Sequence, residues 1–210
     1  MMGHGNMHKP ENVTEWLDRL DQAVKSARCR IDSSEVALEK GTAFVADMLK
    51  NAASDDCSVF WAGNGGSSAI CSHLAQDVMN KLKIRSFYMG DTALMTCMAN
   101  DFGYENVYSR PLEQFIHQND ILIAISSSGN SENILSCVEV AGKKGAHVIS
   151  LSGMKDDNRL FNSGCRVAFF IDSDLYGIVE TGHEALLHGI VETLWLNIEA
   201  GRKFKKRGGK

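Results

Sequence analysis

Residues 120–135 read DILIAISSSGNSENIL, and this stretch decides the fold class. DILIAIS is almost continuously apolar over the length of one strand, as expected of a parallel strand covered on both faces. The serine-rich loop SSSGNS follows it directly, and a run of helical character begins after the loop. A buried strand, a short polar loop and a helix in this order form one unit of an α/β protein.

The same alternation of strands and helices extends in both directions along the chain. Four further runs have strand character, and they are CSVFWAG (57–63), IRSFYM (84–89), AHVISLS (146–152) and CRVAFFI (165–171). Helical runs are expected near 66–82, 92–117, 131–145, 155–163 and 177–200. Because strands that alternate with helices pair in parallel through right-handed crossovers, we predict an α/β fold. Its five-stranded parallel sheet would lie between two layers of helices.

The amino-terminal part, about residues 12–52, is expected to be a helical extension. Apolar side chains recur at three- and four-residue spacing in NVTEWLDRLDQAVKSARCRI, and a second helix is expected from SSEVALEK onward. These helices would pack on the body or supply an oligomer interface. We therefore expect one domain over residues 1–200, followed by a basic, disordered tail, GRKFKKRGGK, at 201–210.

Composition excludes several classes of function. Hydrophobic residues make up 44% of the chain and charged residues 23%, which is the balance of a globular protein. No apolar run is long enough to span a membrane, and the first residues lack the apolar core of a signal peptide, so a cytoplasmic location is expected. The first 200 residues hold 16 basic and 26 acidic side chains, which argues against nucleic-acid binding. The six cysteines form no C-x-x-C pair.

Two polar loops follow predicted strands, at the edge of the sheet where ligands bind in open parallel folds. The first is GNGGSS at 63–68, in which Asn64, Gly65, Gly66 and Ser67 precede a helix whose N–H groups can receive an anion. The second contains Ser126, Ser127, Ser128 and Ser131 around Gly-Asn. Both patterns also occur as tight turns and helix caps, but four serines exceed what a cap requires. The second loop is thus predicted to bind a phosphate monoester.

Histidine and carboxylate side chains gather on two predicted helices. His73 and Asp77 are four residues apart and share one face of the helix after GNGGSS. Glu180 and His183 share a face of the last helix, and His188 lies two turns beyond Glu180. Imidazole and carboxylate together suit zinc or a similar divalent ion. A lone histidine is more often a surface or core residue, and His183 could instead orient Glu180.

Three segments together resemble one known family. AGNGGSSAICSHLAQD, ANDFGYENVYSRPLE and DILIAISSSGNSENIL are similar, in order and spacing, to the sugar isomerase (SIS) domain family and to its phosphoheptose isomerase branch. The resemblance covers roughly residues 40–200. It implies a three-layer SIS sandwich, a homotetramer whose amino-terminal helices lie in the interface, and a role in heptose supply for lipopolysaccharide or capsule.

The resemblance also implies roles for individual residues. The serine loop, Ser126, Ser127, Ser128 and Ser131, would hold the sugar phosphate, and other substrate contacts would come from Asn64, Gly65, Gly66, Asn100, Asp101 and Glu180. A divalent metal, expected to be zinc, would be held by His73, Asp77, Glu180 and His188. The chain departs from the family at two of these positions, with Asp77 in place of a glutamate and Glu180 in place of a glutamine.

We therefore expect an aldose–ketose isomerase of a phosphorylated sugar, sedoheptulose 7-phosphate or a close relative. Asp77 would remove a proton to give an enediolate, His188 would move the second proton, and the metal would assist. The alternative is a non-catalytic SIS module that binds a sugar phosphate or a replication-initiation protein. A nucleotide-binding protein is disfavoured, because neither loop has the lysine or the spacing that such a site uses.

Overall fold

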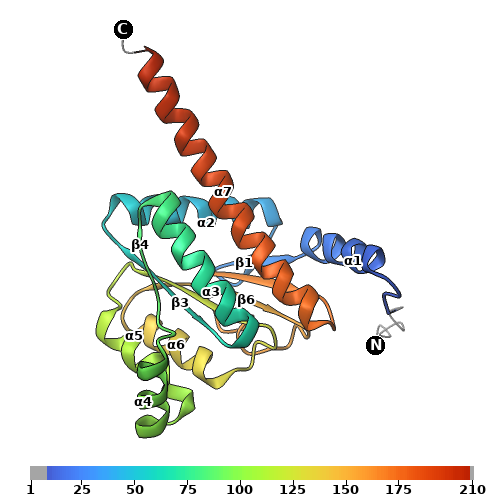
Figure 1. Cartoon of the computed structure of the whole chain (residues 1–210), viewed down its shortest axis with the longest axis vertical. Coiled ribbons are helices and arrows are strands. Elements are labelled where there is room, and N and C mark those ends of the chain that lie inside the picture. The colour runs from blue at the N-terminus through green and yellow to red at the C-terminus, as the bar shows by residue number, and fades with distance from the viewer. Residues whose placement is uncertain (1–8, 209–210) are drawn as a thin grey trace.

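The computed structural model describes residues 9–208, with side chains up to residue 203. A seven-stranded sheet with the order β2-β1-β7-β6-β5-β3-β4 forms the centre of the molecule (Figure 1). Its strands are β1 (Arg28–Ile31), β2 (Ser34–Val36), β3 (Ser58–Gly63), β4 (Arg85–Tyr88), β5 (Ile121–Ser126), β6 (His147–Gly153) and β7 (Val167–Ile171). The helices are α1 (Val13–Lys25), α2 (Leu38–Ser54), α3 (Gly65–Asp77), η1 (Val78–Leu82), α4 (Thr92–Phe102), η2 (Tyr104–Asn106), α5 (Ser109–Phe115), α6 (Glu132–Lys143) and α7 (Tyr176–Gly208).

The five strands expected from the sequence pair in parallel, and helices cover both faces of the sheet. One face packs against α2, α3 and α7 around Trp61, Leu74 and Ile190. The other face packs against α5 and α6 around Leu112 and Ile134. Every residue of β3, β5 and β7 is buried, which explains why these strands are continuously apolar. The prediction of a three-layer α/β fold is confirmed.

The prediction of five strands is corrected by a hairpin in the amino-terminal segment. Residues 28–36, expected to be helical, form β1 and β2, and β1 pairs antiparallel with β7. Asp32 and Ser33 both have positive φ, as a two-residue turn between twisted strands requires. The alternation in Arg28–Ile31 places arginines on one face and apolar side chains on the other. The edge strand β7 therefore gains a partner that a helix could not supply.

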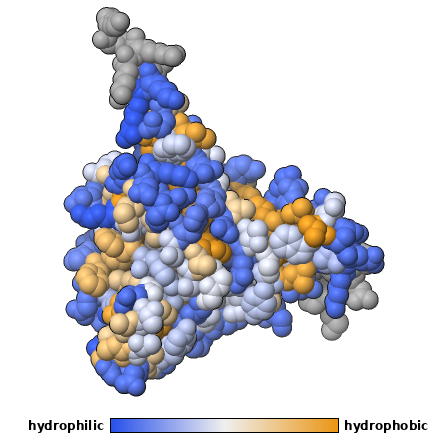
Figure 2. Space-filling model, viewed as in Figure 1, coloured by the Kyte–Doolittle hydropathy of each residue, from blue (hydrophilic) through white to orange (hydrophobic). Residues whose placement is uncertain are grey.

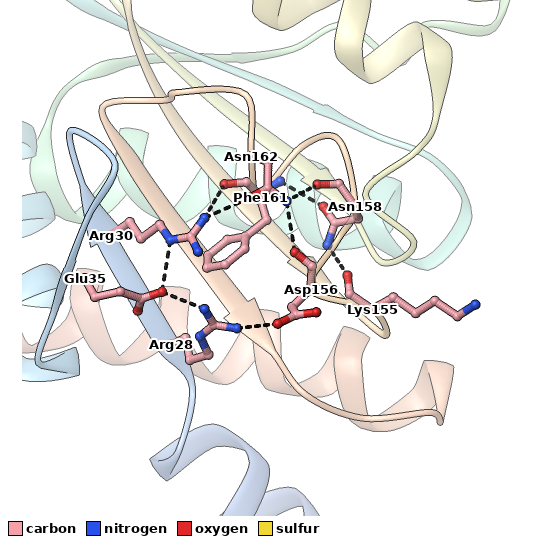
Figure 3. Close-up of polar contacts among 8 residues, drawn as sticks. All are labelled: Arg28, Arg30, Glu35, Lys155, Asp156, Asn158, Phe161 and Asn162. Atoms are coloured by element: carbon pink, nitrogen blue, oxygen red, sulfur yellow. Dashed lines mark hydrogen bonds and ion pairs between the residues drawn. The ribbon is translucent and has the colours of Figure 1, made fainter. Parts of the chain in front are cut away.

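The segment 155–163, expected to be a helix, consists of turns held by side chains from the hairpin (Figure 3). Arg28 forms ion pairs with Asp156 and Glu35, and Arg30 donates hydrogen bonds to Glu35 and Asn162. The guanidinium of Arg30 also lies 4.0 Å from the centre of the Phe161 ring. These contacts give the turns a fixed conformation without helical hydrogen bonds.

Three other helical runs differ in detail from the sequence-based expectation. The run 92–117 divides at Gly103, whose φ of +85° ends α4. The run 66–82 changes from α3 to a π-helix at Val78. Helix α7 continues to Gly208 and so includes most of the segment 201–210, which was expected to be a disordered tail. Residues 209–210 lie outside the described part of the chain.

The chain order of the parallel strands places the two polar loops side by side. From β3 the chain moves to β4 on one side, and then to β5, β6 and β7 on the other. The direction therefore changes between β3 and β5, and in such sheets the ligand crevice lies at this change. The GNGGSS loop follows β3 and the serine loop follows β5. Among the described residues, no helix combines the length and the apolar character needed to cross a bilayer.

The close approach of α2 to β1 gives a first testable prediction. A Cβ atom at Gly41 would lie 2.1 Å from Cys29 Sγ, so Gly41→Ala should destabilise the fold by about 1–3 kcal/mol through overpacking. At Gly142 in α6 a Cβ would meet no atom within 4 Å, so Gly142→Ala should stabilise by up to about 1 kcal/mol. Urea unfolding of both variants measures the difference. Equal effects of the two substitutions would contradict the packing described for β1.

Candidate active site

Two asparagines join the polar loops at the centre of the sheet edge. Asn64 Nδ2 donates to Asn133 Oδ1 at 2.9 Å, and Asn133 Nδ2 donates to Asn64 Oδ1 at 2.8 Å. Asn133 lies in the first turn of α6 and is buried. Asn64, expected to contact substrate, thus also ties the start of α3 to the start of α6. The sequence analysis missed Asn133, because a single asparagine in a helix carries no signal of its own.

The serine loop presents hydroxyl groups with different partners. Ser126 Oγ and Ser131 Oγ lie 3.0 Å apart, and the Asn130 N–H donates to Ser128 Oγ. Ser127 Oγ is buried and makes no hydrogen bond with the described residues. The Ser127 carbonyl accepts a hydrogen bond from the Gly153 N–H at the end of β6. The loop is therefore fixed through its backbone while a buried hydroxyl retains its bonding capacity.

Tyrosine side chains surround the GNGGSS loop. Tyr108 donates to the Gly63 carbonyl at 2.7 Å, and Tyr104 donates to Asn64 Oδ1 at 3.2 Å. Ser68 Oγ is hydrogen-bonded to the Tyr88 hydroxyl. Burial, together with a hydrogen bond to Tyr88, raises the pKa of Tyr108, so its phenol stays protonated. Sequence reasoning missed all three tyrosines, although two of them lie in the second family-like segment.

The remaining substrate-contact candidates lie at two places. Gly65, Gly66 and Ser67 form the first turn of α3, and Ser67 is buried. Asn100 and Asp101 are exposed near the end of α4, where Asn100 donates to Asp101. The structure connects their segment to the GNGGSS loop through Tyr104, four residues after Asn100.

His73, Asp77 and His188 converge where α3 runs beside α7 (Figure 1). A ligand atom from each of the three lies within 4.8 Å of the others. His188 Nδ1 is 3.7 Å from Asp77 Oδ2, and the centres of the two imidazole rings are 5.1 Å apart. Asp77 is buried and His73 is exposed, so the group is open to solvent on one side. Two imidazoles and a carboxylate are a donor set that suits zinc, and these residues therefore fit a divalent cation.

Glu180, expected to be the fourth metal ligand, lies elsewhere in this chain. Its carboxylate rests against the amino end of α3, where a Cβ atom at residue 66 would be 2.5 Å from Glu180 Oε2. Only glycine at 66 permits this approach. The helical rise places Glu180 about 12 Å along α7 from His188. The structure thus separates Glu180 from the group of three, which is His73, Asp77 and His188. The Glu180 carboxylate lies instead at the amino end of α3, which is the positive end of the helix dipole.

Three charged side chains surround the group of three, and sequence reasoning did not single them out. Lys81 Nζ lies 2.8 Å from Asp77 Oδ2 and 3.0 Å from Glu192 Oε1. Hydrogen bonds to these two carboxylates raise the pKa of Lys81, which keeps it charged. Glu184 Oε1 is 3.9 Å from His188 Nε2. The only sequence signal for these residues is their four-residue spacing from Asp77 and His188.

His183 faces the sheet rather than the group of three or Glu180. Its ring is fully buried, and its Nε2 lies 3.0 Å from the Ser152 carbonyl oxygen of β6. Burial lowers the pKa of His183 to about 4, so the ring is neutral and Nε2–H donates to the carbonyl. Because the next residue, Gly153, bonds to Ser127, this contact connects α7 to the serine loop through the end of β6.

Comparison with known protein families identifies the family of the chain. Residues 24–153 match the family model described as SIS domain. The chain belongs to the SIS domain family. The match includes both polar loops, His73 and Asp77, and it ends before α7.

Curated relatives place the chain in the phosphoheptose isomerase branch of the SIS family, and solved structures share its fold. The phosphoheptose isomerase of Campylobacter concisus is 34% identical over 75% of this chain and 84% of its own length. That of Proteus mirabilis is 29% identical over 89% of this chain and 95% of its own length. The structure of phosphoheptose isomerase from Neisseria gonorrhoeae superposes with a TM-score of 0.74 at 24% identity, over 86% of this chain and 93% of that chain. The resemblance stated from sequence is confirmed.

The buried His183 gives a prediction about acid stability. The pKa of His183 is about 4 in the folded chain and 6.5 in the unfolded chain. Between pH 6.5 and 4 the unfolded chain therefore binds a proton at this residue that the folded chain does not bind. The stability associated with the neutral ring is therefore complete above pH 6.5. It is lost as the pH falls, by about 3 kcal/mol in total.

Replacement of this histidine should remove the pH-dependent part of the loss. We expect His183→Gln, which retains a donor for the Ser152 carbonyl, to show a smaller fall in unfolding free energy between pH 7 and 4.5 than the parent protein. Urea unfolding of this variant and of the parent at several pH values measures the difference. Parallel profiles for His183→Gln and the parent would show that His183 is not buried as a neutral ring.

Proposed function

We propose that this SIS-family chain is an aldose–ketose isomerase that converts sedoheptulose 7-phosphate, or a closely related ketose phosphate, to an aldose phosphate. The convergence of His73, Asp77 and His188 between α3 and α7 is the observation that carries the proposal. Membership of the family and relatives named phosphoheptose isomerase support a sugar-phosphate isomerase. The residue roles, the metal and the choice of sugar are parts of the proposal.

In this proposal the serine loop anchors the phosphate of the substrate. The loop contributes the hydroxyls of Ser126, Ser127, Ser128 and Ser131, and it opens α6, whose first N–H groups face an incoming anion. The buried, unpaired hydroxyl of Ser127 supports this role, because a buried polar group without a partner is costly unless a ligand satisfies it. Binding at the phosphate then positions the opposite end of the sugar for reaction.

Proton transfer is assigned to the α3–α7 contact. Asp77 accepts the proton from the carbon beside the carbonyl, which gives an enediolate, and returns it to the neighbouring carbon. His188, 3.7 Å from Asp77, moves the second proton between the two substrate oxygens. A divalent ion, when bound by His73, Asp77 and His188, supplies polarisation of the carbonyl oxygen. The zinc-type donor set on the described residues supports this part of the proposal.

Glu180 is proposed to contact the substrate rather than the metal within the same chain. It lies at the first turn of α3, beside Gly66, and it accepts hydrogen bonds but cannot donate them when ionised. A sugar hydroxyl that donates to this carboxylate is the partner that fits. Asn64, Gly65, Gly66, Ser67, Asn100 and Asp101 remain proposed substrate contacts.

The cytoplasmic homotetramer and the supply of heptose for lipopolysaccharide or capsule belong to the same proposal. Helix α1 supports an interface, since Val13 and Leu17 are 73% and 51% exposed. Hydrophobic surface gathers on this projecting helix (Figure 2). A non-catalytic sensor or adaptor would have no need for two imidazoles and a carboxylate within 4.8 Å, so the geometry favours the enzyme.

An activity assay tests the proposal directly. Incubation with sedoheptulose 7-phosphate, with and without zinc, should yield an aldose phosphate detectable by NMR. Asp77→Asn should lower kcat by about 100-fold or more, because the amide cannot accept the proton. Asp157→Asn, an exposed control, should retain parental kinetics. Absence of aldose phosphate from this and other ketose phosphates would refute catalysis.

The phosphate anchor gives a separate kinetic prediction. Ser127→Ala removes the buried unpaired hydroxyl and should raise KM about tenfold, since one hydrogen bond to a charged group is worth about 1.5 kcal/mol or more. Ser127→Thr keeps the hydroxyl and should recover much of the affinity. Inorganic phosphate should inhibit the parent protein more strongly than Ser127→Ala. An unchanged KM in Ser127→Ala would remove this residue from the phosphate site.

A further inference from the structure

Lys81 places a positive charge on the carboxylate at the centre of the group of three. Its Nζ donates to Asp77 Oδ2 at 2.8 Å, and the same oxygen faces His188 Nδ1 at 3.7 Å. The Lys81 side chain is only 24% exposed, and the Asp77 side chain 11%, so solvent screens the pair incompletely. A cation of this chain is therefore in contact with a carboxylate that the proposed function assigns to a divalent ion.

Lys81 has a second acidic partner on the neighbouring helix. Glu192 Oε1 lies 3.0 Å from Lys81 Nζ, and its side chain is 52% exposed. Glu192 follows His188 by one turn of α7, just as Lys81 follows Asp77 by one turn. The ammonium thus lies between a more buried carboxylate and a more exposed one, and it contacts both.

We propose that Lys81 is a built-in cation that competes with a divalent metal ion for Asp77, and that Glu192 is the partner to which it withdraws when the metal binds. The inference rests on the proposed function only in its assignment of the cation site to His73, Asp77 and His188. It assigns a role to two residues that the metal-ligand set does not include.

Simple electrostatics gives the competition a direction. Two positive charges a few ångströms apart repel each other strongly where water is partly excluded, so a divalent ion at Asp77 displaces the ammonium or binds more weakly. The lysine side chain is flexible, and its Nζ lies 5.9 Å from the centre of the Trp195 ring. Since Glu192 is already in contact, the ammonium keeps a carboxylate partner after it leaves Asp77.

The two residues should affect metal affinity in opposite directions. Lys81→Met removes the competing charge and keeps an unbranched side chain, so zinc should bind about tenfold more tightly. Glu192→Gln removes the alternative partner and leaves the ammonium on Asp77, so zinc should bind severalfold more weakly. Lys81→Arg keeps the charge and should stay close to the parent. In the Lys81→Met background, Glu192→Gln should change zinc affinity little, because the ammonium that Glu192 receives is absent. An equal effect of Glu192→Gln in both backgrounds would show that Glu192 acts only through its own charge.

Isothermal titration of the metal-free full chain with zinc measures the dissociation constants, and cobalt absorption reports the coordination. Lys143→Met and Glu139→Gln, from an exposed pair four residues apart on α6, are matched controls and should leave affinity unchanged. Thermal unfolding identifies variants that fail to fold. For such a variant, Lys81→Gln or Glu192→Ala takes its place with the same expected sign.

The outcomes separate this inference from the proposed function. Tighter binding by Lys81→Met together with weaker binding by Glu192→Gln supports the competition, even if no ketose phosphate is isomerised by the parent. Zinc binding by Lys81→Met alone also supports the competition, because Lys81 would then exclude zinc completely from the parent protein. Equal zinc affinities in the parent and both variants overturn it, and so does an absence of zinc binding in all three, whatever the isomerase assay yields.

Discussion

The packing of α3 against α7 is the constraint on which the candidate site depends. His73 and Asp77 project from α3, His188 projects from α7, and the group exists only while the two helices stay in this register. The shared core around Leu74, Ile190 and the sheet fixes the register. The hydrogen bond of His183 to β6 adds a polar restraint inside that core. Apolar packing therefore holds α3 beside α7, and the hydrogen bond of His183 further restrains α7 against the sheet.

The sequence was sufficient to predict the five parallel strands of the sheet, because buried parallel strands have a characteristic apolar pattern. The strands β3, β5 and β7 are buried along their whole length, and the loops after β3 and β5 supply polar residues at the ligand-binding edge. The hairpin at 28–36 was missed because its strands have only four and three residues, and the arginines on one face of β1 resemble the polar side of an amphipathic helix. The turns at 155–163 depend on Arg28 and Arg30, which are more than 120 residues away and leave no local signal.

The site shows the same division between local and distant information. The four-residue spacing of His73 and Asp77 predicts a shared helical face, and the structure places both residues in the group of three. The same reasoning could not place Glu180, because its position depends on how far α7 extends along α3. Lys81 and Glu192 have ordinary charged-residue spacing, and such pairs usually lie on solvated faces. Their contact joins two helices that are far apart in the sequence, so it depends on the tertiary structure.

The π-helix that follows Asp77 gives a local reason for the position of Lys81. The turn after Asp77 is wider than an α-turn, and Val78–Leu82 are in this conformation. In a wider turn the fourth residue lies closer to the same face as the first, so Lys81 falls over Asp77 and still reaches Glu192. Asp77 is one methylene shorter than a glutamate, and a neighbouring ammonium fixes the orientation of its carboxylate. A short acid, a widened turn and a bridging lysine together define how this branch member presents its carboxylate.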